Sequence, residues 1–501
     1  MIKQFKDYNS DIKEFCDVCV IGSGAGGAVA AKEIAEKGFS VVLLEEGGHH
    51  TSKTWSGKPL KGTIEMYRNG GSTLSIGNAF IPITLGKCIG GTTTINSATC
   101  FRTPEYILKK WQKDLGLENL TYKNLEHYFL RVEKEINVTE LSWDILGNAA
   151  KVVKRGADRL GLKCRPLKHN VRDCRGCGTC QFGCIENAKQ STDVSYIPKA
   201  IKAGARVYAH CRADKLKISN KTVKGVTGSL INPETGKSVF SITVNAKIVI
   251  VSCGSLLTPP FLKKNRIRNR HIGRHLQIHP AGRVAALMDE KVEGWKGVSQ
   301  GVYIHDFQNE GIILEGIFLH PSLMLATLPG IGNEFKELAT QYPNIAAFGV
   351  MVHDSSTGRV LKGFSPGSFL AIYNMKRTDI KKLKKGIAET SRIFFAAGAK
   401  KVFTGVSKYP ILNSIDDVDK FLKIKIKPNN FEILAFHPLG TCRMAATSKD
   451  GVVDQNGESF EIKNLYIADG SVVPTSLGVN PQITIMTLAT MIAEGITKKI
   501  A

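Results

Sequence analysis

The chain has 501 residues, more than the roughly 250–300 at which a single hydrophobic core stops growing, so two intermixed domains are expected. Its 43% hydrophobic and 22% charged residues are typical of a globular enzyme and exclude a disordered or low-complexity protein.

Lys and Arg (68) outnumber Asp and Glu (44), which gives a net charge of +24. This surplus predicts a solvated basic surface or the steering of an acidic partner, such as a small electron-carrier protein. No nucleic-acid module accompanies the charge, so a nucleic-acid role is not expected.

The ends and the cysteines of the chain indicate its compartment. The first 15 residues lack the apolar core of a signal peptide, and no run of about 18 apolar residues predicts a transmembrane segment. Eight of the 12 cysteines are scattered, often in apolar strands such as those of Cys19 and Cys253, which is typical of reduced thiols. We therefore expect a cytoplasmic protein.

The first predicted elements form a dinucleotide-binding unit. A buried strand at 16–21 precedes a glycine turn and a helix at 28–37, and a second strand at 39–44 ends in Glu45. The turn carries Gly22, Gly24 and Gly27. Such glycines let the backbone approach a pyrophosphate at the helix N-terminus, and the acid can accept hydrogen bonds from an adenosine ribose. The order predicts a Rossmann-like fold but leaves NAD and FAD open.

Four cysteines are clustered further along the chain, at Cys174, Cys177, Cys180 and Cys184. Their spacing equals that of bacterial ferredoxin ligands, although Ile185 replaces the proline that follows the last cysteine there. No second cysteine group is available, so three or four of these thiols would bind one 3Fe–4S or 4Fe–4S cluster. A zinc site usually takes two pairs separated by a longer loop. The spacing favours an iron–sulfur cluster over structural thiols or zinc.

The last seventy residues hold the candidate catalytic pair, His437 and Asn480, each directly before a proline. An imidazole with a pKa near 6.5 can take a hydroxyl proton, and an amide can both donate to and accept from the same oxygen. A predicted strand at 465–468 ends in Asp469. Because open α/β sheets bind ligands at strand ends, Asp469 is a candidate cofactor contact, with a helix N-cap as the alternative.

Four motifs in order carry a resemblance to a known family. They are 90–96, 251–259, 272–280 and the C-terminal set from 437 to 481. This pattern is similar to that of the glucose–methanol–choline (GMC) oxidoreductases, from residue 16 to about 495. The resemblance implies bound FAD, with the flavin loop at Gly90, Gly91 and Asn96, the adenine near Cys211, and the phosphate, ribityl chain and ring near Asp469, Gly470 and Pro481.

The same resemblance implies that His437 is the catalytic base, that Asn480 is its partner, and that His279, also before a proline, is structural. The cysteine-rich segment resembles a subgroup with long-chain alcohol oxidases, cholesterol oxidases and bacterial FAD sugar dehydrogenases. A cluster beside a flavin gives electrons an exit that does not require oxygen. We therefore expect a dehydrogenase that oxidises an alcohol, sterol or sugar, with an oxygen-reducing oxidase or a non-redox flavin lyase as the alternatives.

The expected architecture is α/β. Residues 1–280 and 430–501 should form the Rossmann-like FAD-binding domain, with the cysteine-rich segment inserted at 165–195. Residues 281–429 should form a substrate domain on a largely antiparallel sheet with helices, including strands at 301–304 and 311–319. The apolar runs at 317–319 and 323–325 hint at a hydrophobic substrate, although such runs are more often core.

Overall fold

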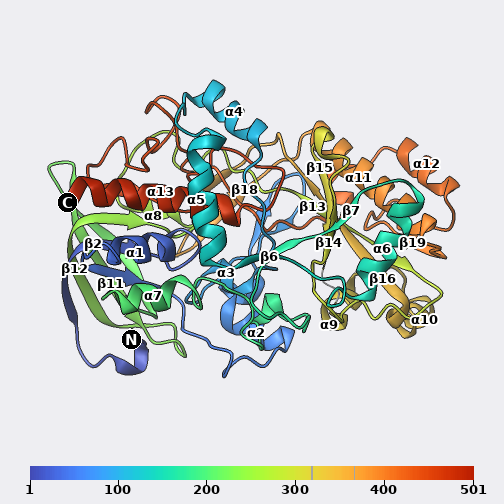
Figure 1. Cartoon of the computed structure of the whole chain (residues 1–501), viewed down its shortest axis with the longest axis horizontal. Coiled ribbons are helices and arrows are strands. Elements are labelled where there is room, and N and C mark those ends of the chain that lie inside the picture. The colour runs from blue at the N-terminus through green and yellow to red at the C-terminus, as the bar shows by residue number, and fades with distance from the viewer. Residues whose placement is uncertain (318–319, 366) are drawn as a thin grey trace.

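The structure of the protein is a computed structural model that describes every residue except 318, 319 and 366. Two large sheets lie toward opposite ends of the molecule, and both chain termini lie at the end that holds the first sheet (Figure 1). The expected fold class, a Rossmann-like α/β unit joined to a unit with an antiparallel sheet, is confirmed.

The first sheet is parallel at its centre. From one edge its strands are β1 (Ile2–Lys3), β9 (Arg206–Tyr208), β3 (Val41–Leu44), β2 (Ile12–Ile21), β12 (Ser238–Val251), β11 (Thr222–Ile231) and β10 (Cys211–Ser219), and β21 (Leu465–Ile467) pairs with the last residues of β12. The C-terminal parts of the central strands, at 18–21 in β2, 41–44 in β3 and 248–251 in β12, are buried apolar runs, as expected for a sheet covered by helices. The predicted strands at 16–21, 39–44 and 465–468 are therefore present with slightly different ends.

Three helices build the layer next to this sheet. Helix α1 (Gly27–Ala35) follows the glycine turn and packs against α13 (Gln482–Ile500) and α7 (Tyr196–Lys202). All nine residues of α1 are buried, which its alanines allow because they permit close helix–helix approach. Helix α13 crosses the face of the sheet in Figure 1 and also contacts α5 (Tyr122–Glu135). The C-terminal helix thus fixes the segment that carries Asn480.

The second sheet is antiparallel throughout. Its strands are β20 (Ile411–Leu412), β19 (Lys401–Phe403), β13 (Ala281–Leu287), β16 (Ile345–Val352), β15 (Ile312–Gly316), β14 (Val302–Ile304) and β7 (Cys164–Pro166). Helix α11 (Arg377–Ala396) packs on β13, β15 and β16, and α6 (Asn148–Arg159) packs beside it. The predicted antiparallel strands near 301–304 and 311–319 are confirmed as β14 and β15, while residues 318 and 319 lie outside the described residues.

Smaller elements connect the two units. A four-stranded sheet joins β17 (Arg359–Lys362) and β18 (Phe369–Ile372) to β4 (Leu74–Ile76) and β5 (Ile81–Pro82). The other elements are α2 (Pro59–Met66), α3 (Thr92–Ile95), α4 (Glu105–Leu115), β6 (Val138–Glu140), β8 (Lys168–Asn170), α8 (Thr258–Lys264), α9 (Pro321–Met324), α10 (Asn333–Thr340) and α12 (Asp416–Lys423), besides short 3-10 turns. Because β7 and α6 belong to the second unit, segments before residue 281 contribute to both units, and the domain bounds remain a prediction.

Among the described helices, none combines the length and the apolar character that a bilayer crossing requires.

Candidate active site

A cavity of about 890 Å³ is lined by residues of both units. This volume lies in the range typical of ligand and cofactor pockets. On one side it is bounded by the glycine turn after β2, the end of β3 and the start of β10. On the other side its wall comes from β13, β15 and β16. The cavity therefore connects the Rossmann-like unit with the antiparallel sheet.

The glycines of the turn divide into two kinds. Gly22, Gly24 and Gly26 line the cavity; a Cβ on Gly24 would meet no atom within 4 Å, whereas one on Gly22 would lie 2.3 Å from the carbonyl oxygen of Ser252. A Cβ on Gly26 would lie 1.6 Å from the carbonyl oxygen of Ala468, and one on Gly27 would lie 1.9 Å from that of Gly22. Gly26 and Gly27 therefore permit close packing of α1 on the sheet, while Gly24 leaves open space in front of the helix.

Glu45 lines the cavity at the end of β3. Its Oε2 accepts hydrogen bonds from the backbone N–H (3.0 Å) and hydroxyl (2.7 Å) of Ser23, and its Oε1 accepts from the N–H of Gly47 (2.8 Å). Burial raises the pKa of this carboxyl. Cys211, which also lines the cavity, donates its N–H to the backbone oxygen of Glu45 at 2.8 Å. The acid and the predicted adenine contact thus lie side by side.

The predicted flavin loop around α3 contributes Gly91 and Asn96 to the cavity wall. The Asn96 amide donates to Gln482 at the start of α13, and its oxygen accepts from the N–H of Ala98 at 3.0 Å. Gly90 does not line the cavity; a Cβ there would lie 2.2 Å from Thr94 Oγ1. Gly90 therefore serves the packing of the loop.

Asp469 follows β21 and lines the cavity together with Gly470 and Pro481. Its Oδ2 accepts hydrogen bonds from the N–H of Gly254 (2.8 Å) and the hydroxyl of Thr258 (2.6 Å). Its Oδ1 accepts from the N–H of Ser471 at 2.8 Å, and burial raises the pKa of the carboxyl. The next described helix begins at Gln482, so the alternative of a helix N-cap is wrong. Asp469 fixes two loops at the cavity edge.

His437 and Asn480 meet in the cavity wall. The Asn480 Nδ2 lies 3.4 Å from the His437 Nε2. Burial lowers the pKa of His437 to about 4, so the imidazole is neutral at pH 7. Neither His437 Nδ1 nor Asn480 Oδ1 has a hydrogen-bond partner among the described residues. Because buried polar atoms are normally paired, these atoms indicate a place where another molecule completes the hydrogen bonding.

His279 supports this pair from behind. Its Nε2 accepts hydrogen bonds from the N–H groups of Leu477 and Gly478, both at 2.9 Å, in the loop that leads to Asn480. Its ring lies 5.5 Å from that of His437 in an edge-to-face arrangement. The ring is fully buried, and burial holds its pKa well below the ordinary value. His279 thus has the structural position that the sequence implied.

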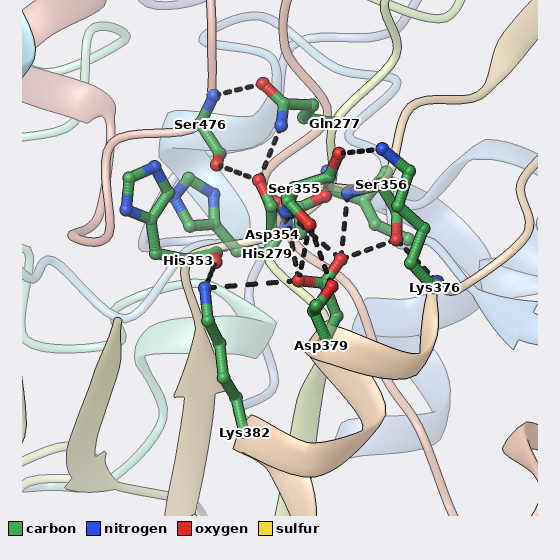
Figure 2. Close-up of polar contacts among 12 residues, drawn as sticks. Gln277, His279, His353, Asp354, Ser355, Ser356, Lys376, Asp379, Lys382 and Ser476 are labelled. Atoms are coloured by element: carbon green, nitrogen blue, oxygen red, sulfur yellow. Dashed lines mark hydrogen bonds and ion pairs between the residues drawn. The ribbon is translucent and has the colours of Figure 1, made fainter. Parts of the chain in front are cut away.

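A buried polar network continues from His279 toward α11, as Figure 2 shows. The Asp354 carboxylate accepts from the N–H of His279 at 3.3 Å, and the Asp354 backbone oxygen accepts from Gln277 (2.6 Å) and Ser476 (3.2 Å). Asp379, on α11, accepts from the N–H groups of Ser355 and Ser356. The loop of Asn480 is therefore tied to the helix that supports the second sheet.

Glu315, on β15, is a cavity residue that the sequence reasoning missed. It is 6% exposed, its side chain hydrogen-bonds Asn480, and its Oε2 has no partner among the described residues. Burial raises the pKa of Glu315 to about 7. The signal in the sequence was a single acid inside the apolar run of β15, because a glutamate is rarely buried without a partner.

The cysteine-rich segment lies next to the cavity. Cys180 and Cys184 are buried and Cys174 and Cys177 are half-buried. The Cys177 and Cys184 thiols are within hydrogen-bond reach of each other. Across residues 1–317, 320–365 and 367–501, however, no three His, Cys, Asp or Glu side chains form a group that could hold a metal ion. The iron–sulfur ligand set therefore stays a prediction.

Two neighbours of these cysteines reach the cavity. Gln181 and Phe182 line it, and Gln181 donates to Ser97 at 2.9 Å. The buried Lys189 ammonium donates to the backbone oxygens of Thr94 (2.7 Å), Asn96 (2.8 Å) and Cys180 (2.6 Å). Lys189 thus ties the cysteine-rich segment to the predicted flavin loop.

Comparison with known proteins identifies the family. Models of the GMC oxidoreductase N- and C-terminal domains match residues 63–281 and 370–489, and a Rossmann-like NAD(P)-binding model matches 20–78. An uncharacterized GMC-type oxidoreductase of Sinorhizobium fredii is 32% identical over 97% of this chain and 95% of its own length. The chain belongs to the GMC oxidoreductases. It is therefore a flavin-dependent oxidoreductase.

Proteins with named activities are also similar over most of the chain. A long-chain-alcohol oxidase of Arabidopsis thaliana is 28% identical over 96% of this chain and 67% of its own length. A cholesterol oxidase of Acinetobacter baumannii is 24% identical over 94% of this chain and 93% of its own length. Among solved structures, pyridoxine 4-oxidase from Mesorbium loti superposes with a TM-score of 0.73 at 18% identity, covering 96% of this chain and 99% of its own. That likeness supports the fold.

Proposed function

We propose that the protein oxidises the CH–OH group of a hydrophobic alcohol or sterol with FAD as the hydride acceptor. The observation that carries this proposal is the His437–Asn480 pair, whose unpartnered polar atoms belong to the wall of the cavity that the glycine turn also lines. A neutral imidazole and an amide within 3.4 Å of each other can serve one hydroxyl group together.

The chain fits FAD in three places. The open space in front of Gly24 lies at the N-terminal end of α1, where free N–H groups favour a pyrophosphate. Glu45 and Cys211 would contact the adenosine end, and Gly91, Asn96 and Pro481 the flavin end. When bound, FAD supplies the two-electron acceptor for the hydride that leaves the alcohol carbon.

The reaction assigns separate tasks to the two catalytic residues. Asn480 donates a hydrogen bond to the alcohol oxygen and orients it toward His437. His437 accepts the hydroxyl proton on a ring nitrogen while the C–H bond breaks, so the carbonyl product forms without a free alkoxide. Alignment of this kind can lower a barrier by about 7–11 kcal/mol, so the fixed loops around His279 and Asp354 matter for the rate.

The wall of the cavity favours a substrate with a hydrocarbon body over a sugar. Its apolar residues near the second sheet are Ile317, Leu323, Met324, Val350, Met351, Leu434 and Phe436. The relatives named as a long-chain-alcohol oxidase and a cholesterol oxidase support the same class. An aliphatic alcohol or a sterol would therefore bury most of its surface in this wall.

For the electron acceptor we propose an acceptor other than oxygen, in keeping with the cysteine spacing. The position of Gln181 and Phe182 in the cavity wall supports this, because it brings the cysteine-rich segment to the predicted flavin loop. The thiols, as described, do not form a three-ligand group. The related enzymes named as oxidases make an oxygen-reducing oxidase the second candidate.

The proposal is tested by rapid mixing of the FAD-loaded protein with a panel of alcohols without oxygen. The His437→Ala variant should keep its bound FAD but lose flavin reduction by about 10²–10⁴-fold. His127→Ala, an exposed histidine on α5, is the matched control and should behave as wild type. An unchanged reduction rate in His437→Ala would reject His437 as the base.

The acceptor is tested on protein purified without oxygen, by quantifying iron and sulfide. Three or four irons per chain, lost in a Cys180→Ser variant, would support a dehydrogenase. Protein without iron that reoxidises rapidly in air would support the oxidase.

A further inference from the structure

Glu315 belongs to a row of residues that crosses the second sheet. In register, Arg283 on β13 pairs with Gly349 on β16, Gly349 pairs with Glu315 on β15, and Glu315 pairs with Tyr303 on β14. Directly paired residues of antiparallel strands share a face of the sheet. Arg283, Gly349 and Glu315 all line the cavity, so this face is the one turned toward His437 and Asn480. Gly349 has no side chain, and a Cβ there would lie 3.0 Å from the backbone oxygen of Glu315.

The Glu315 carboxyl lies within hydrogen-bond reach of the Asn480 amide, and its Oε2 has no partner among the described residues. The same amide nitrogen lies 3.4 Å from His437 Nε2. An amide NH₂ group carries two hydrogens, so it can donate one to the Glu315 carboxyl and the other to the alcohol oxygen, which replaces its contact with His437 when substrate binds. The base and the carboxyl are therefore joined through a single amide.

The groups around Glu315 leave its charge uncompensated. Tyr303, on β14, is the direct strand partner of Glu315. Arg283 lies one strand further, on the other side of Gly349, and its guanidinium is already paired with both carboxylate oxygens of Glu432 at 2.7 Å. His437 and His279, from the loops, line the same cavity, and burial keeps the pKa of both imidazoles low. When the alcohol proton reaches His437, the new cation therefore has one uncommitted carboxyl nearby.

We propose that Glu315 is the counter-charge for the proton that His437 takes from the alcohol, acting through the Asn480 amide. This inference rests on the proposed function. The proton moves from the alcohol oxygen to His437, the hydride leaves the carbon for the flavin, and Glu315 stays a carboxylate throughout. An imidazolium in a buried site is costly, and a nearby opposite charge lowers that cost. Because Glu315 touches neither reacting atom, it is a positioning residue.

The first test is the pH dependence of flavin reduction by a saturating alcohol. In the wild-type enzyme the rate should rise with pH as Glu315 ionises near pH 7. Glu315→Gln keeps the hydrogen bond to Asn480 but has no charge, so it should lose this inflection and fall at least about tenfold at pH 8. Glu315→Asp should restore the inflection. A Glu315→Gln enzyme with the wild-type rate and profile would overturn the proposal, even if Glu315→Ala is impaired.

The second test does not depend on turnover. The infrared C=O stretch of a protonated carboxyl should disappear from the FAD-free protein as the pH rises through about 7, and it should be absent in Glu315→Gln. A band that persists in the wild-type protein at pH 8 and is missing in Glu315→Gln would overturn the inference, because the carboxyl would then carry no charge. If no alcohol reduces the wild-type flavin, the proposed function fails. The infrared titration still shows, independently of turnover, whether the Glu315 carboxyl is charged.

Discussion

Alanine substitutions in the glycine turn separate cofactor binding from folding. Gly24→Ala places a methyl group where no atom of the chain lies within 4 Å, in the cavity wall. Gly26→Ala places it 1.6 Å from the carbonyl oxygen of Ala468. The two substituted positions lie two residues apart in one turn, and each variant adds one methyl group. The added methyl should clash with the cofactor in Gly24→Ala and with the protein backbone in Gly26→Ala.

The expected magnitudes follow from these contacts. The FAD-free Gly24→Ala protein should be as stable as wild type or more stable by about 0.4–1 kcal/mol, because alanine reduces the entropy of the unfolded chain. Gly26→Ala should lose about 3 kcal/mol or more, the upper end of overpacking, because its obstacle is a backbone oxygen at the end of β21. For FAD, Gly24→Ala should bind at least about tenfold more weakly, or about 1.4 kcal/mol.

Two measurements check this prediction. Thermal unfolding of the FAD-free variants gives the stability order, and quenching of FAD fluorescence gives the affinities. If Gly24→Ala bound FAD as tightly as wild type, the pyrophosphate would not lie at this turn. If Gly26→Ala were as stable as wild type, the close packing of α1 against β21 would be wrong.

Three further predictions concern the rest of the site. Asp469→Asn replaces an acceptor of three hydrogen bonds with a group that also donates, so the free energy of unfolding should fall by roughly 1–3 kcal/mol, measured by urea denaturation. Gly349→Val adds a side chain to the cavity wall, with its Cβ 3.0 Å from the backbone oxygen of Glu315, so KM for bulky alcohols should rise severalfold while bound FAD stays unchanged; an unaltered KM would remove Gly349 from the substrate wall. The pKa values of His275, His353 and His437 are lowered to about 4 by burial, so the unfolded chain binds more protons between pH 4 and 6.5. Stability should therefore fall as the pH drops through this window, and a flat melting temperature there would contradict the burial of these rings.

The local parts of the fold could be predicted from the sequence. The strand, glycine turn and helix around residue 22 depend on neighbours in the chain, so their order is visible in the residues themselves. Sequence alone could not separate the task of Gly24 from that of Gly26, because the difference lies in contacts with Ala468. The sequence motifs identify His437 and Asn480 as candidates, but only the fold places Asn480 Nδ2 3.4 Å from His437 Nε2.

Other parts of the site depend on register between distant strands. Glu315 faces the cavity because β15 pairs with β16 at Gly349, and no local pattern gives that pairing. The cysteine spacing predicted a cluster, yet the described thiols form no group of three able to hold a metal ion. Spacing fixes which side chains can reach a common centre, while the fold decides whether they do.

The central claim is that an alcohol passes its hydride to a flavin in this cavity. The most direct measurement is the absorption spectrum of the FAD-loaded protein, recorded without oxygen before and after addition of a long-chain alcohol or a sterol. The account predicts that the flavin band bleaches with substrate and that the carbonyl product appears in equal amount. A flavin that stays oxidised with every alcohol tested, while the product of some other reaction accumulates, would contradict it.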